Sequence, residues 1–180
     1  MKFSPEHYHQ FQESYSKESD RSVAILAAAY LEHCLEEYLR LRLVDDPSVK
    51  DLFSGFAPIA TFSAKIDIAF AVGLLPPHIR EDLRRIKKIR NLFAHDLDSL
   101  TFDAGPVRDI CDKFSWPRSD GTRRKAPTAR AQFLNAVFWC LLHIYTERDR
   151  TSRLPLPKFH FEEVVEDKNS AEPAAGGNAE

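Results

Sequence analysis

The stretch from Arg21 to Leu43 is apolar around nearly the whole circumference of a helix, which limits the folds open to this chain. The apolar residues of one side are Val23, Ala27, Tyr30, Leu31, Cys34, Tyr38 and Leu41, and those of the other are Ile25, Ala29, Leu39 and Leu43. A helix that is apolar on most of its sides belongs to a core. Glycine is scarce (6 in 180 residues) and good helix formers are abundant, so its neighbours are expected to be helices as well.

Start and stop signals divide the rest of the chain into further helices. We expect helices over residues 5–17, 21–43, 61–72, 77–94, 105–114 and 128–148, with a short helical turn at 48–52. Asp20 and Thr128 are expected to cap the helices over 21–43 and 128–148. Gly73 is expected to end the helix over 61–72. The fold class is therefore all-α, a single-domain bundle of about six to seven helices with a disordered C-terminal tail.

Three regions are expected along the chain. Residues 1–19 form an N-terminal polar helix, residues 20–150 the helical domain, and residues 151–180 an extended or disordered tail. Within the tail, 158–165 alternates weakly between apolar and polar residues and could form one short strand. Residues 166–180 lack large apolar side chains, which is typical of disorder.

The formal net charge of −2 hides two basic segments. Candidate nucleic-acid contacts in these segments are Arg80, Arg84, Lys87, Lys88, Arg123, Arg124 and Lys125. The alternative is an ordinary solvated helix face and, from Pro117 to Pro127, a basic exposed loop. The helix over 77–94 can touch phosphates but lacks a cluster of base-reading side chains at its N-terminal end. Sequence-specific DNA binding is therefore possible but unsupported.

Cysteine usage and hydropathy exclude several classes of protein. The three cysteines, Cys34, Cys111 and Cys140, are isolated, so we expect buried, reduced thiols and no zinc ribbon. The longest apolar run, 23–31, covers about half of a bilayer span. We expect a cytoplasmic protein with no membrane contact, no metal site and no cofactor.

Arg90, Asn91 and His95 form the most suggestive chemical pattern. Arginine binds phosphate through a planar charged fork, and histidine moves protons near neutral pH. The two side chains are separated by roughly 140° on an ideal helix. They converge only if the helix distorts or if a second subunit supplies another copy, so a working site would be composite at a two-fold interface. A homodimer is therefore expected.

A structural role for Arg90 is the competing interpretation. The apolar arc of its helix, which comprises Ile79, Leu83, Ile86, Phe93 and Ala94, also contains Arg90. A buried cation needs a partner, and Glu32 and Glu36 lie four apart on an apolar stripe of the central helix. We expect one of these glutamates to meet Arg90 in the core, the alternative being that both face water.

Lys65 has two interpretations as well. It lies with Ser63 on a short amphipathic helix, where the pair could bind an anion. A surface lysine close to a helix cap is the simpler explanation.

Arg90-Asn91-x-x-x-His95, on a helix of a small bundle, resembles the Arg-polar-x(3–5)-His signature of the HEPN superfamily. HEPN domains are helical and usually dimeric, and they include metal-independent ribonucleases. The resemblance implies that His95 acts as base or acid towards an RNA 2′-hydroxyl. Arg90 would then stabilise charge on the phosphate while Asn91 orients the histidine.

Several blocks in order and spacing resemble the mannitol operon repressor (MltR) family, within or near that superfamily. The blocks are Ala27 to Glu32 with Leu35-Glu36, Leu52 to Pro58, Thr61 to Ile66, and Ile89 to His95. The likeness covers about 21–102 and implies a bacterial, cytoplasmic, helical transcriptional regulator without a recognisable DNA-binding motif.

We favour a non-enzymatic regulatory protein of MltR type that acts through a protein partner. A HEPN-type endoribonuclease of a toxin or defence system is the alternative, and a direct DNA-binding repressor is the second alternative.

Overall fold

The computed structural model describes residues 5–96, 100–114, 116–117 and 123–157, and in these residues the chain forms six α-helices and one 3-10 helix. The helices are α1 (Pro5–Ser14), α2 (Asp20–Arg42), η1 (Pro47–Phe53), α3 (Phe62–Ala71), α4 (Pro77–His95), α5 (Gly105–Cys111) and α6 (Ala129–Arg148). Two short strands, β1 (Trp116–Pro117) and β2 (Arg123–Arg124), complete the described part. The all-α prediction is confirmed.

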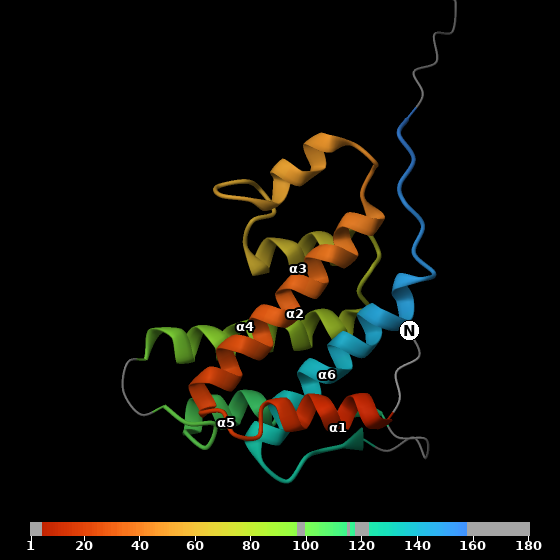
Figure 1. Cartoon of the computed structure of the whole chain (residues 1–180). Coiled ribbons are helices and arrows are strands. Elements are labelled where there is room, and N and C mark those ends of the chain that lie inside the picture. The colour runs from red at the N-terminus through yellow and green to blue at the C-terminus, as the bar shows by residue number, and fades with distance from the viewer. Residues whose placement is uncertain (1–4, 97–99, 115, 118–122, 158–180) are drawn as a thin grey trace, which may run out of the picture.

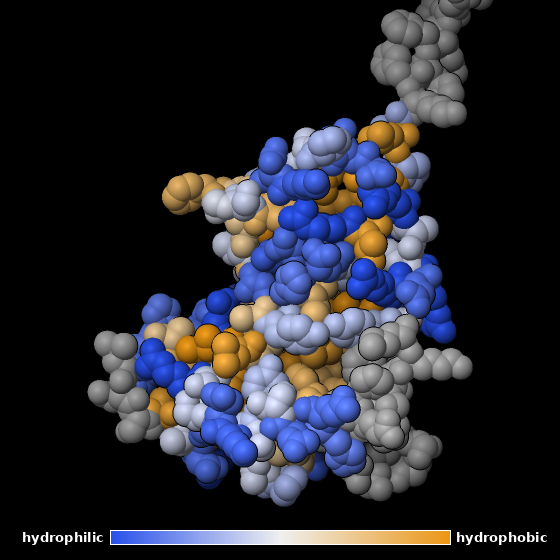
Figure 2. All heavy atoms as spheres, viewed as in Figure 1, coloured by the Kyte–Doolittle hydropathy of each residue, from blue (hydrophilic) through white to orange (hydrophobic). Residues whose placement is uncertain are grey.

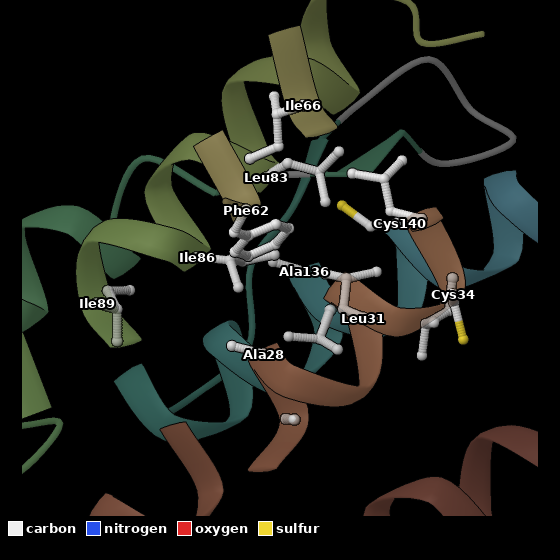
Figure 3. Packing of buried hydrophobic residues seen from close by; sticks show 14 of the residues in the cluster. Ala28, Leu31, Cys34, Phe62, Ile66, Leu83, Ile86, Ile89, Ala136 and Cys140 are labelled. Carbon is white, nitrogen blue, oxygen red and sulfur yellow. The ribbon is translucent and has the colours of Figure 1, made fainter. Parts of the chain in front are cut away.

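Helix α2 organises the bundle by packing against α3, α4 and α6 (Figure 1). Small side chains at Ala24, Ala27 and Ala28 are fully covered, which lets neighbouring helices approach closely. Figure 3 shows how the core is built, with Leu31 of α2 among side chains from three other helices. The neighbouring helices do not cover all of α2, because Leu26 is 52% exposed and Tyr30 is 44% exposed.

Local signals place most of the helix ends. The Thr128 side chain caps α6 by accepting from the Ala131 N–H, as expected. Gly73 has a φ of +77°, and its N–H donates to the Phe70 carbonyl just beyond α3, as expected for a residue that ends a helix.

The cap of α2 differs from the prediction. Ser19, not Asp20, is the capping residue, and its hydroxyl accepts from the Ser22 N–H. Asp20 is the first helical residue, and its carboxylate binds two groups that are distant in sequence. It accepts from the Phe102 N–H at 2.9 Å and pairs with Arg130 at 2.7 Å. The Asp20 carboxylate therefore binds groups that are distant in sequence instead of capping its own helix.

The segment predicted as an exposed loop from Pro117 to Pro127 also differs. Two of its residues, Arg123 and Arg124, form an antiparallel pair with β1, in which Trp116 is opposite Arg124 and Pro117 is opposite Arg123. Beyond α6, the backbone of 151–157 has neither helix nor strand. It returns to α2, where the Leu154 N–H donates to the Arg42 carbonyl at 2.8 Å. The short strand predicted at 158–165 and the disorder predicted at 166–180 lie outside the described residues.

Two features are absent from the described residues. None of their helices is both long and apolar enough to cross a membrane. No group of three or more His, Cys, Asp or Glu side chains among them could hold a metal ion. All three cysteines are buried free thiols.

Candidate functional site

The candidate site lies around α4, whose buried residues define one face. These buried residues are Ile79, Leu83, Ile86, Ile89 and Phe93. Helical rotation predicts Arg90 and Ala94 on this arc as well, but the Arg90 side chain is 31% exposed and Ala94 is exposed. On an ideal helix Ile89 lies at one edge of this face and Leu83 at the other, with Ile86 near its centre, so the buried arc is rotated by roughly 30° from the predicted one.

Lys65 of α3 is the cation that meets the two glutamates of α2. Its ammonium group lies 3.0 Å from Glu32 Oε1 and 3.0 Å from Glu36 Oε2, and the residue is only 6% exposed. Arg40 extends the cluster by binding the other Glu36 oxygen at 2.8 Å. The interpretation of Lys65 as a surface lysine is therefore wrong. A lysine this deeply buried is stable only because both carboxylates surround it.

Arg90 occupies the edge of this cluster. Its Nη2 lies 3.8 Å from Glu32 Oε2, which is an ion-pair distance but exceeds a hydrogen bond. Its guanidinium carbon lies 5.8 Å from the centre of the Phe62 ring. The Nε atom is buried, with no hydrogen-bond partner among the described residues. Lys65, not Arg90, is thus the main partner of the glutamates, and Glu36 forms its ion pairs with Lys65 and Arg40.

The protonation equilibria reflect this pairing. Burial opposes the charged form of Lys65, but hydrogen bonds to Glu32 and Glu36 outweigh it, so the pKa of Lys65 is raised. Burial also opposes ionisation of Glu36, but hydrogen bonds from Arg40 and Lys65 outweigh it, so the pKa of Glu36 is lowered. Both shifts favour the charged forms, so Lys65 and Glu36 are charged near neutral pH.

The other flank of α4 borders a cleft of about 840 Å³. The cleft is lined by Ser63, Arg84, Lys87, Lys88, Asn91, Leu92, His95, Asp96, Leu100 and Pro106. Asn91 and His95 are exposed there. Arg90 is not among the lining residues. The structure therefore brings Asn91 and His95 together with two lysines, and leaves Arg90 with the α2–α3 charge cluster.

The other basic residues of α4 are engaged with acidic partners to different degrees. Arg80 and Arg84 both bind Asp67 of α3, at 3.3 and 2.7 Å, and Arg80 stacks over Phe70 at 4.2 Å. The hydrogen bond from Arg84, followed by that from Arg80, lowers the pKa of Asp67. Lys87 donates to the Ser63 hydroxyl at 3.1 Å.

The second predicted basic segment is described less fully. Lys125 is exposed. The backbones of Arg123 and Arg124 form β2, but their side chains lie outside what the structure describes.

Sequence reasoning missed the role of Lys65, although a signal was present. Phe62, Lys65, Ile66 and Ala69 follow a helical spacing of three, four and seven, and all four are buried on one face of α3. A lysine within such a stripe needs a buried anion, and Glu32 and Glu36 were the available pair.

Comparison with known proteins gives one informative likeness. No family model matches the sequence, and no curated protein matches it. Among solved structures, the fold is similar to a chain of the "X-ray structure of the MtlR-HPr complex from Escherichia coli". The match has a TM-score of 0.55 at 17% identity and covers 76% of this chain and 97% of that chain. This likeness supports an MtlR-like fold. At 17% identity it supports the fold alone.

Proposed function

We propose that this protein is a non-enzymatic regulator that acts by binding a partner protein. The observation that carries the proposal is the likeness to MtlR, whose solved structure is a complex with HPr. A cytoplasmic setting and a role in transcriptional repression belong to the same proposal, because both follow from the MltR resemblance. Homodimerisation is a further part of it.

The position of Arg90 argues against a catalytic site assembled within one chain. A metal-independent nuclease of the HEPN type needs its arginine and histidine at one phosphate. Arg90 lies against Glu32 and Phe62, whereas His95 lines the cleft on the other flank of α4. One chain therefore does not assemble the pair.

The apolar surface of the chain offers contacts for a partner (Figure 2). Phe56 is fully exposed at the tip of the loop that follows η1. Gly55 precedes it with a φ of +61°, a conformation that other residues rarely adopt. Exposed aromatic side chains are enriched among residues that dominate binding energies at interfaces. Leu26 and Tyr30 form a second exposed apolar area on α2.

The proposal is tested by measuring binding between the purified protein and the HPr encoded in the same genome. We expect saturable binding in titration calorimetry, and the Phe56→Ser variant is expected to weaken it at least about tenfold. Leu156→Ser is the matched control, because Leu156 is also a large exposed apolar residue (60%) and lies outside both apolar areas. Absence of binding at high micromolar concentrations would contradict an HPr-type partner.

The two alternative functions are tested in parallel. A ribonuclease would degrade mixed RNA, and both His95→Ala and Arg90→Ala would abolish the degradation. A DNA-binding repressor would retard operator DNA, with an affinity that falls steeply with salt. We expect neither result. Size-exclusion chromatography with light scattering tests the homodimer. A molar mass equal to that of one chain would exclude it.

A further inference from the structure

We propose that the cleft beside α4 binds a small phosphate monoester whose organic part carries a flat or apolar ring, as in a nucleoside monophosphate. The proposal does not depend on the regulatory function above. It rests on three features of the cleft: two lysines with no carboxylate at ion-pair distance among the described residues, a polar stripe along α4, and an apolar wall.

The positive charge of the cleft comes from Lys87 and Lys88. Arg84 also lines it, but its charge is matched by Asp67 at 2.7 Å and by Glu81 at 3.4 Å. Lys87 donates to a neutral hydroxyl, and among the described residues neither lysine has a carboxylate within 4.0 Å. Among the described residues, the two ammonium groups of this cleft therefore have no carboxylate at ion-pair distance, which favours an anionic ligand.

The neighbourhood of Lys87 suits a phosphate group in particular. The Ser63 hydroxyl, 3.1 Å from Lys87 Nζ, lies in the first turn of α3, where the helix dipole places partial positive charge. Sequence reasoning had paired Ser63 with Lys65 for such a role. The fold buries Lys65 among glutamates and brings Lys87 of the next helix to Ser63 instead.

The remainder of the cleft suits an organic group larger than phosphate. Its volume of about 840 Å³ lies within the range of small-molecule sites and far exceeds the size of a phosphate ion. Leu92, Leu100 and Pro106 supply apolar wall, while Asn91 and His95 supply hydrogen-bonding groups along α4. Asp96 is the one carboxylate among the described lining residues, and it would repel a second anionic group.

The test is a titration of the full-length protein at low salt, followed by calorimetry or by chemical shifts, with three probes. Adenosine 5′-monophosphate presents both the phosphate and the ring, adenosine lacks the phosphate, and inorganic phosphate lacks the ring. We expect the monophosphate to bind best, and its affinity to fall as salt rises. Lys87→Gln is expected to weaken it roughly tenfold, because a charge-assisted hydrogen bond is lost.

Lys50→Gln is the matched control, since it removes the same charge from an exposed lysine of η1 that does not line the cleft. It should leave the affinity unchanged, and thermal unfolding of both variants should match the unmodified protein. Equal affinities for the monophosphate and adenosine, or for Lys87→Gln and the unmodified protein, would overturn the proposal. So would the absence of binding at millimolar monophosphate. Equal affinity for inorganic phosphate would overturn the role of the apolar wall.

Discussion

The two flanks of α4 border similar cationic side chains in opposite electrostatic situations. On the flank that faces α2, Lys65 and Arg90 meet Glu32 and Glu36, and Lys65 is almost completely buried. On the flank that borders the cleft, Lys87 and Lys88 have no carboxylate partner among the described residues. The first arrangement is expected to hold the helices together, and the second to be available for a ligand. Pairing and burial, rather than residue type, distinguish the two roles.

The largest expected effect is the loss of the Lys65 charge. Lys65→Met keeps most of the side-chain volume but leaves Glu32 and Glu36 close together without their shared cation. We expect a loss of about 3 kcal/mol in the free energy of unfolding, because breaking a buried ion pair leaves uncompensated charge. Urea unfolding followed by circular dichroism measures it. A loss below about 1 kcal/mol would mean that Arg40 and solvent suffice to hold the glutamates.

The next effect concerns pH. The pKa of Glu36 is lowered on folding, so its contribution to stability is present above its ordinary value of 4.5 and is lost as pH falls through the folded value. The pKa of Lys65 is raised, so its contribution is present below 10.5 and is lost as pH rises through the folded value. These ion pairs therefore stabilise the folded state most between these two pH values.

Glu36→Gln tests the acid side of this window. We expect it to lower stability at pH 7 by on the order of 1 kcal/mol, since a hydrogen bond between charged groups is replaced by a weaker one. The variant should also show a shallower decline in urea midpoint between pH 6 and pH 3. An unchanged slope would assign the decline to other carboxylates.

Arg90→Met is expected to have a smaller effect, below about 1 kcal/mol. Its ion pair with Glu32 is long at 3.8 Å, and the side chain is 31% exposed, so solvent screens the interaction. Urea unfolding again supplies the measurement. A loss as large as that of Lys65→Met would show that the two cations are equivalent, and the contrast within the cluster would disappear.

The smallest effect is expected on the cleft side. Lys87→Gln should change the free energy of unfolding by less than about 0.5 kcal/mol, because the lysine donates only to a hydroxyl and remains partly exposed. A thermal melt beside Lys65→Met makes the comparison directly. A strong destabilisation would mean that the contact between Lys87 and Ser63 holds α3 to α4.

Much of the fold was predictable because its signals are local. The 3.6-residue periodicity placed the helices within a few residues of their observed ends, and the cap at Thr128 and the stop at Gly73 depend only on neighbouring backbone groups. Asp20 was assigned a local role that Ser19 performs instead. The partners of Asp20, Phe102 and Arg130, are distant in the chain, so short-range rules did not reveal them.

The site was predictable only in part. The rotation of an ideal helix correctly separated Arg90 from His95. The same rotation predicts Arg90 within the buried arc, yet its side chain is 31% exposed, because burial also depends on which neighbouring elements cover each turn of the helix. Ile89, which the predicted arc omits, is fully buried at the edge of this face.

By itself, the sequence determined which segments are helical, roughly where they end, and that an acidic pair on α2 required a cation. Periodicity and capping are properties of the chain over a few residues, and a buried carboxylate needs a partner wherever it lies. The tertiary structure decided that Lys65 is that cation and that Lys87 lies beside Ser63. Both outcomes depend on how α3 and α4 pack against α2, and residues far apart in sequence become neighbours only through that packing.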